Sequence, residues 1–444
     1  MKNLEKFMLP LANKIGTNKY LVSIRDGFLL TTPLLIVGSF FLCLKSFPIN
    51  GWAELVGQIF GPNWQASVNQ PVNASLNTMA LFAVFGIAYS FAREMKTNKV
   101  FCGALALAGF LILMPFSFTA EIAGVAGEVG GISTDYLSAN GIFVGIFSAF
   151  LTVHLYSFVE KKGWLIKMPA GVPPTVSESF SALIPTAVVF TAFFLLQVLF
   201  KVTPWGDAFN FILDVFQNPL KNLGSTLGAM IGAFFFSNFL WFFGVNGASI
   251  MDAVYQPTLY TLSLENANLV SQGLEPVNII NMQFKDLFAI YGGSGSTLSL
   301  LIAMIFFCKS ERIKALGKIS LVPGLFNINE PIIFGMPIML NPLMFIPFLI
   351  VPTMNIIVSY YAMALGLVNI TNGAIIPWTC PVGISGFLAT GWQGAVLQIL
   401  LVIAGIFVYY PFVKIMDKQY LEEEAKATET KEDDISLDDL ALDL

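Results

Sequence analysis

The sequence is poor in charge and contains a single histidine. Charged residues make up 11% of its 444 positions, whereas soluble domains carry about 25%. So few charges cannot cover the surface of a water-soluble fold of this size, which excludes a soluble enzyme. The lone histidine, His154, excludes a metal site built from several histidines. It also leaves His154 as the one candidate base for a Ser-His-Asp triad, although a core histidine is the better interpretation.

Cysteine is equally scarce. The four cysteines are scattered through apolar stretches without the spacing of metal ligands. Isolated cysteines of this kind are typical of small buried hydrophobic side chains. A disulfide scaffold is therefore excluded, and we expect no metal and no cofactor.

Apolar residues are what the sequence has in excess. They make up 56% of the chain, and the mean hydropathy is +0.73. A membrane helix needs about 20 mostly apolar residues. Nine stretches qualify: 27–44, 76–92, 100–118, 141–159, 180–200, 223–245, 286–308, 342–367 and 393–413. Two more, 325–341 and 370–390, are interrupted by proline, glycine and asparagine, and 246–285 must hold a further crossing or a re-entrant excursion. The pattern predicts an all-α polytopic membrane protein with about ten transmembrane helices plus re-entrant hairpins.

The loops alternate in charge along the first half of the chain. The N-terminal region, 93–99 and 161–167 are basic, whereas 46–75 and 119–140 contain no lysine or arginine. Under the positive-inside rule, this places the N-terminus in the cytoplasm, and an even number of crossings puts both termini there. The first 25 residues hold scattered basic residues without a compact apolar core, so we expect no cleaved signal peptide.

Two segments outside the apolar stretches divide the chain into regions. Residues 206–222 carry apolar side chains on one helical face, which favours an amphipathic helix linking a membrane half, 1–205, to a second half, 223–416. An ordinary extramembrane helix fits them equally well.

The final 28 residues hold 11 of the 28 acids and 3 of the 23 bases, which leaves the rest at a net charge of +3. This acidic segment, 417–444, is predicted to be a disordered solvating tail, with a docking role as the alternative.

Three stretches indicate where ligand chemistry lies, because irregular backbone at membrane depth occurs only inside protein or along a wet cavity. The first, 326–335, contains Asn329 and Glu330. An ionisable group between apolar flanks is a functional candidate, and a carboxylate can accept two sugar hydroxyls or act as a base toward one. The alternative for Glu330 is a buried helix cap or a structural partner for a base.

The second stretch, 376–387, contains Trp378, whose indole face suits the apolar face of a pyranose ring; an interface tryptophan is the alternative. The third pairs Trp241 and Asn246 with a glycine-rich run that includes Gly293 and Ser296. Asn246 offers both donor and acceptor groups. The glycine-rich backbone suits close approach of either a ligand or another helix. Asp252, in the unassigned 246–285, is a further candidate.

Together these stretches resemble the membrane component IIC of the bacterial phosphotransferase system, of the lactose/cellobiose/diacetylchitobiose type. The most specific matches are Asn327-Ile328-Asn329-Glu330-Pro331, Pro377-Trp378-Thr379 and Trp241-Phe242-Phe243-Gly244. The resemblance covers roughly 1–416. It implies a homodimer in the bacterial cytoplasmic membrane, formed through the N-terminal half, with the C-terminal half around a β-linked disaccharide. It also implies partner proteins IIA and IIB, of which phospho-IIB phosphorylates the sugar, and no phosphorylated residue in this chain.

The resemblance also implies roles for the candidate residues. Glu330 would hold the hydroxyl to be phosphorylated, and Trp378 would stack on the ring. Asn329, Trp241, Asn246 and the backbone around Gly293 and Ser296 would line the pocket. The chain departs from the pattern at Asn246, where a histidine is common; asparagine can hydrogen-bond a hydroxyl but cannot take up a proton at physiological pH. The run Thr379-Cys380-Pro381 also replaces a more proline-rich one.

Two functions of other classes fit the composition equally well. One is a secondary sugar transporter driven by an ion gradient, with Glu330 or Asp252 as proton carrier. The other is a membrane sensor or assembly factor that transports nothing. No feature indicates a nucleic-acid partner.

Overall fold

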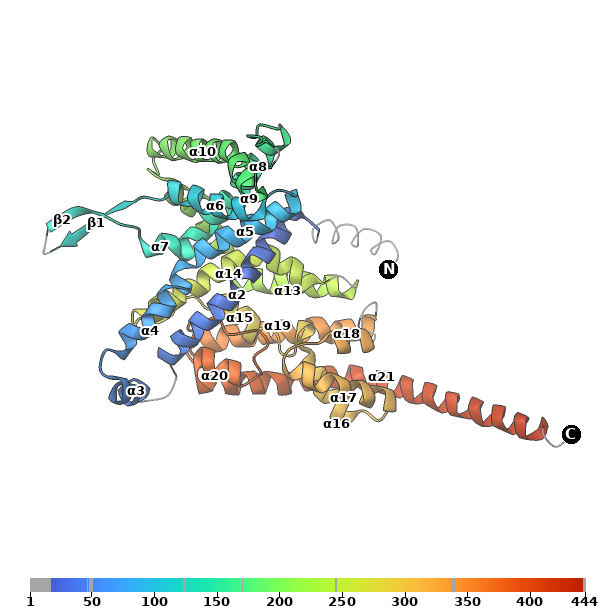
Figure 1. Cartoon of the computed structure of the whole chain (residues 1–444). Coiled ribbons are helices and arrows are strands. Elements are labelled where there is room, and N and C mark those ends of the chain that lie inside the picture. Colours follow the sequence, from blue (N-terminus) through green and yellow to red (C-terminus); the bar gives the residue numbers. More distant parts are fainter. Residues whose placement is uncertain are drawn as a thin grey trace.

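The computed structural model describes residues 17–45, 47, 51–122, 125–169, 171–243, 246–336, 338 and 341–441. For 118–122, 125–128, 139, 330 and 426–441 it describes the backbone alone. Most of this length is helical, as predicted, and the long helices run roughly side by side (Figure 1). The hairpin β1–β2 and helices α3 and α4 lie at the end opposite to that from which α21 projects (Figure 1).

Five long helices form the N-terminal part and cover the apolar stretches predicted between 27 and 200. Helix α2 packs along α5, α5 along α6 and α8, and α10 along both α6 and α8. A side chain on Gly86 would come within 2.6 Å of the backbone oxygen of Gly27, so small residues allow α2 and α5 this close approach. The five helices are α2 Lys19–Lys45, α5 Met79–Met95, α6 Lys99–Leu113, α8 Ile142–Lys161 and α10 Leu183–Lys201.

Short elements connect these helices, and one pair departs from the all-α prediction. Strands β1 (Ser117–Ile122) and β2 (Val125–Gly130) form an antiparallel pair that matches Ser117 with Gly130. The predicted span 100–118 ends earlier, at Leu113, because Pro115 disfavours helical backbone at the residue before it. The other connecting elements are α3 Trp52–Phe60, α4 Trp64–Asn73, η1 Leu76–Thr78, α7 Thr134–Leu137, η2 Ala139–Gly141 and α9 Pro174–Ser181.

The linker region is helical, but it is not one regular helix. It consists of α11 (Ala208–Ile212), the π-helical η3 (Leu213–Gln217) and α12 (Asn218–Gly224). Phe209 is fully buried, whereas Phe216, expected on the same apolar face, is 52% exposed. The π-helical turn changes the angular spacing of side chains and so moves Phe216 off that face. Helix α13 (Leu227–Phe242) follows at an angle of 79°.

The C-terminal part alternates long helices with broken ones. Residues 246–285 contain the 25-residue helix α14 (Gly247–Ser271), which begins at the cap Asn246. The prediction of one continuous span over 286–308 is wrong. That stretch breaks after α15 (Met282–Phe288) because Gly292, Gly293 and Gly295 take positive φ angles of 76°, 84° and 76°. The remaining elements are η4 Ser294–Ser296, α16 Thr297–Phe307, α17 Glu311–Leu325, α18 Glu330–Gly335, α19 Pro342–Ala364, α20 Ile384–Thr390 and α21 Trp392–Ala441.

The described ranges contain six helical segments long and apolar enough to cross a membrane, and a seventh if the bent pair 208–242 counts as one. This supports a helical membrane protein. The count of about ten transmembrane helices remains a prediction.

Helix α21 continues past residue 417, where the composition predicted a disordered tail. Asp417 accepts hydrogen bonds from the backbone N–H groups of Lys309 and Ser310, both at 2.9 Å. Glu424 accepts one from the Ser310 hydroxyl at 2.6 Å. Glu424 also accepts the N–H of Arg312, in the first turn of α17, at 3.1 Å. The two carboxylates therefore satisfy polar groups at the start of α17, which anchors the first part of the acidic segment. Helix α21 extends to Ala441, and disorder over 417–444 stays a prediction.

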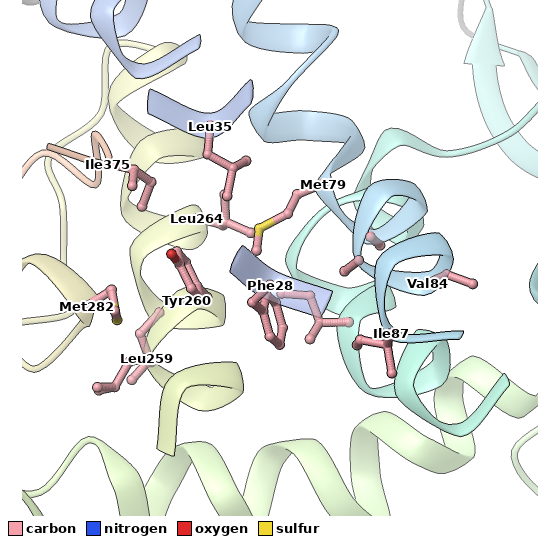
Figure 2. Close-up of a cluster of buried hydrophobic side chains, with 14 of the residues drawn as sticks. Phe28, Leu35, Met79, Val84, Ile87, Leu259, Tyr260, Leu264, Met282 and Ile375 are labelled. Atoms are coloured by element: carbon pink, nitrogen blue, oxygen red, sulfur yellow. The ribbon is translucent and has the colours of Figure 1, made fainter. Parts of the chain in front are cut away.

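A shared core joins the two parts of the chain. Figure 2 shows Phe28 and Leu35 of α2 lying against Met79 and Val84 of α5 on one side and Tyr260 of α14 on the other. The rings of Phe28 and Tyr260 stack with their centroids 5.3 Å apart. Met282 and Ile375, which belong to non-contiguous segments, close the same cluster (Figure 2). Helix α14 therefore connects the N-terminal bundle to the broken helices.

Candidate functional site

A cavity of about 440 Å³ lies where the broken segments meet, within the size range of sites that bind small molecules. Helices α2, α13, α14 and α15 form part of its wall, and three non-helical segments form the rest. Six of the predicted residues line it. Five of them come from the three candidate stretches, namely Trp241, Asn246, Gly293, Asn329 and Trp378, and the sixth is Asp252. The structure thus brings together residues that are up to 137 positions apart in the sequence.

Two asparagines hold the non-helical segments in place. Asn327 accepts a hydrogen bond from the N–H of Gly292 at 2.6 Å and donates to the carbonyl of Trp378 at 2.6 Å. Asn329 donates to the carbonyl of Ser294 at 2.8 Å. Because irregular backbone in a membrane must be satisfied by protein groups, these bonds support the cavity wall. The amide N–H groups of Asn329, predicted to bind substrate, therefore bond within the wall.

The segment that carries Trp378 is tied down in the same way. Ser39 of α2 accepts a hydrogen bond from the N–H of Ile375 at 2.7 Å, and Gln283 of α15 accepts one from Ile376 at 3.0 Å. The Trp378 side chain remains 52% exposed. The backbone of this segment is therefore held by α2, by α15 and by Asn327, while the Trp378 ring is accessible at the cavity.

On α13 and α14, the two predicted residues differ in how their polar atoms are used. Asn246 caps α14, with its side-chain oxygen accepting the N–H of Ser249 at 3.0 Å. The indole Nε1 of Trp241 is buried and has no hydrogen-bond partner among the described residues. A buried donor of this kind is unfavourable unless something accepts from it, and the cavity is where an acceptor fits.

Ser296 does not belong to the cavity wall. It is fully buried, where its hydroxyl accepts a hydrogen bond from the N–H of Tyr291 at 3.2 Å and contacts Asn355 at 2.9 Å. Its role is to hold the break between α15 and α16, because its own φ of 57° is the left-handed conformation that this break requires. The hydroxyl of Ser296 is thus engaged within the protein, and its predicted part in substrate binding stays a prediction.

The side chain of Glu330 lies outside the described residues, and the structure describes its backbone. Glu330 is the first residue of α18, after the cap position Asn329, and Pro331 falls in the first turn, where proline is tolerated. The preceding carbonyl, of Asn329, accepts the N–H groups of Ile332 and Ile333 at 3.0 and 2.9 Å. Glu330 therefore directly follows a residue of the cavity wall.

Sequence reasoning missed most of a charged cluster in the same wall. The ammonium group of Lys285 lies 2.6 Å from a carboxylate oxygen of Asp252 and 3.0 Å from one of Asp286. The sequence analysis named only Asp252 as a candidate. Lys285 and Asp286 lie at the edge of the apolar stretch 286–308, which was predicted to be a continuous transmembrane span. Two adjacent ionisable residues at membrane depth were the available signal.

Comparison with known proteins assigns the chain to a family. The description "Phosphotransferase system, EIIC" matches residues 25–352. This chain belongs to the EIIC family of the phosphotransferase system. EIIC components are the membrane components of that system and work with IIA and IIB partners. Membership supports a sugar permease over the ion-driven transporter and the sensor.

Similar proteins match along nearly the whole chain. The cellobiose-specific EIIC component of Geobacillus stearothermophilus is 40% identical over 431 residues, covering 96% of both chains. The lichenan permease IIC component of Bacillus subtilis (strain 168) is 38% identical over 426 residues, covering 95% of this chain and 94% of that protein. Among solved structures, the transporter ChbC, the IIC component of the N,N'-diacetylchitobiose-specific system, superposes with a TM-score of 0.92. It is 40% identical, over 95% of this chain and 99% of that one.

Proposed function

We propose that this EIIC component binds a β-linked disaccharide of the cellobiose, chitobiose or lactose class in the 440 Å³ cavity and presents it for phosphorylation by phospho-IIB. One observation carries the proposal. Trp241, Asn246, Gly293, Asn329 and Trp378, from three separate stretches, line one cavity. The printed names of the relatives, which specify cellobiose, lichenan and N,N'-diacetylchitobiose, support the sugar class.

The wall offers what a pyranose ring needs. The accessible indole of Trp378 supplies a flat apolar face for the ring, and the unpaired Nε1 of Trp241 supplies a donor for a hydroxyl oxygen. Gly293 brings backbone to the surface of the cavity without a side chain in the way. In this proposal, Glu330 holds the hydroxyl to be phosphorylated and takes its proton as the phosphoryl group arrives from IIB.

The orientation and assembly follow as parts of the same proposal. Both termini face the cytoplasm, as the basic loops indicate, and the sugar enters from outside. The N-terminal half, 1–205, forms a homodimer, and 223–416 carries the sugar. The least buried apolar span, in Pro174–Lys201, supports a dimer contact, because only 17% of its apolar window is buried inside the chain.

The test of the proposal is sugar uptake by proteoliposomes. With phospho-IIB inside, wild-type protein should accumulate phosphorylated disaccharide, and collapse of the proton gradient should leave the rate unchanged. Uptake that needs the gradient and not phospho-IIB would indicate the ion-driven alternative, and no uptake under either condition would indicate a sensor.

Glu330→Gln tests the assigned base. This variant should abolish phosphorylation while the protein remains folded, because a neutral amide cannot accept the hydroxyl proton. The measurement is phospho-sugar formation, with the elution profile on size exclusion as the control for folding. Wild-type rates in this variant would contradict the role of Glu330.

A further inference from the structure

The cluster of Asp252, Lys285 and Asp286 lies in the cavity wall but has no part in the chemistry described so far. Lys285 is nearly inaccessible, with its side chain 6% exposed, whereas the side chains of Asp286 and Asp252 are 13% and 28% exposed. The lysine is therefore the buried centre of the cluster, and the two carboxylates are its more accessible members.

The charges of the cluster do not balance. One ammonium faces two carboxyl groups, so the cluster carries a net charge of −1 when both are ionised, in a largely buried position. A structural ion pair would need one acid only, and a surplus buried charge is unfavourable unless donors stabilise it. Lys285 is the only described side chain that forms an ion pair or hydrogen bond with either carboxylate. Each carboxylate therefore has an oxygen available as an acceptor at the cavity.

Further unpaired polar atoms belong to residues that line the same cavity. Gln256 lies one helical turn from Asp252 on α14 and lines the same cavity, and its buried side-chain oxygen has no partner within the described ranges. Trp241, on α13, adds an unpaired donor. Neighbouring hydroxyls on a sugar ring can donate to two such acceptors and accept from such a donor at once. The unpaired groups are thus complementary to a diol.

Charge decides which part of a substrate fits beside the cluster. A cation is disfavoured at Asp252, because the ammonium of Lys285 already lies 2.6 Å away. A phosphate is disfavoured by the net negative charge of the cluster. The part of the disaccharide that acquires the phosphoryl group must therefore face away from Asp252 and Asp286, and the uncharged second ring must face them.

We infer that Asp252, Asp286 and Gln256, with Lys285 holding the two carboxylates in position, form a subsite for the hydroxyls of the ring that is not phosphorylated. The subsite determines that the substrate is a disaccharide rather than a single sugar. This inference rests on the proposed function, since it assigns the second ring of the proposed substrate.

The experiment compares two ligands on purified full-length protein by isothermal titration calorimetry. Cellobiose contains both rings, whereas methyl β-D-glucoside contains one. Asp252→Asn removes one charge and keeps the shape of the side chain. It should weaken cellobiose binding about 10-fold, the effect of losing a charged hydrogen bond, and leave methyl β-D-glucoside binding unchanged. Trp378→Ala should weaken both.

Glu265→Gln is the matched control. Glu265 lies on the same helix as Asp252 and pairs with Lys221, away from the cavity, so its loss removes an ion pair without touching the subsite. Cellobiose affinity should match wild type. If Asp252→Asn fails to fold, Gln256→Leu replaces it, with the same selective loss expected.

The outcomes separate the inference from the proposed function. If wild-type protein binds none of cellobiose, lactose and diacetylchitobiose, the proposed function fails. If wild-type protein binds cellobiose, and the folded variant binds it equally well or loses affinity for both ligands alike, the inference alone is overturned.

Discussion

Individual residues at the cavity differ in whether their polar atoms face the ligand or the protein. Asn327 and Asn329 use their amides to hold backbone, whereas Trp378 and Trp241 present a free ring face and an unpaired donor. Residue type alone did not separate these roles. Substitutions at single positions should therefore divide into those that change affinity and those that change the shape of the wall.

Trp378→Ala should weaken disaccharide binding by about 1.5 kcal/mol, or roughly 10-fold, because the ring face that contacts the sugar is lost. The side chain is half exposed, so its removal leaves the core intact, and the melting temperature should change little. Calorimetric titration of the purified variant measures the affinity. Equal affinities for wild type and variant would show that the sugar does not stack there.

Asn246→His restores the residue that the family commonly has at this position. Loss of the helix cap should lower the free energy of unfolding by about 1 kcal/mol, because the Ser249 N–H loses its acceptor. Binding should be retained. Thermal melting and cellobiose titration are the two measurements, and Thr226→Ala, which removes the similar cap of α13, is the control. Loss of binding only in Asn246→His would show that the asparagine itself contacts the sugar.

At the scale of elements, breaks in helices shape the site. The stretch 286–308 reads as one apolar span, but four of its residues between 292 and 296 take positive φ angles. Those turns bring Gly293 beside Asn329, and the two segments form one wall of the cavity.

Gly293→Ala should disrupt this wall. An added Cβ would lie 2.6 Å from the Asn329 side chain, and the φ of 84° is unfavourable for alanine. We expect sugar affinity to fall at least about 10-fold and stability to fall by about 1–3 kcal/mol. Gly228→Ala is a suitable control, because a Cβ there meets nothing within 4 Å. If the Gly293→Ala variant binds the sugar with wild-type affinity, the segment around Gly293 adjusts to the added Cβ without changing sugar binding.

At the scale of the whole molecule, helix α21 links the membrane part to the acidic segment. Asp417 is nearly inaccessible and binds the start of α17 across more than 100 positions of sequence. The guanidinium of Arg312 also lies over the Tyr420 ring, 4.4 Å from its centre.

Asp417→Asn should release this connection. The amide retains one acceptor oxygen but loses the charge that two N–H groups share, so stability should fall by about 1–2 kcal/mol. Limited proteolysis should cut faster after 417 than in wild type. Glu422→Gln, on the exposed part of the same helix, serves as control and should match wild type. Equal cleavage of all three proteins would refute an anchoring role.

The sequence by itself determined the membrane class, most of the long helices of the first half and the three stretches whose residues line the cavity. Those features depend on hydropathy, loop charge and helix-breaking residues, which act locally and can be read from neighbouring positions. Even so, it missed the hairpin after Pro115 and the anchoring of the segment after 417.

Only the tertiary structure decided which candidates face the cavity. It placed Ser296 outside the cavity wall, gave Asn246 a capping role, and joined Lys285 to Asp252 across 33 positions. The reason is physical: whether a polar side chain is free for a ligand depends on which distant groups already bond to it. That is fixed when the helices pack, and no local pattern in the chain records it.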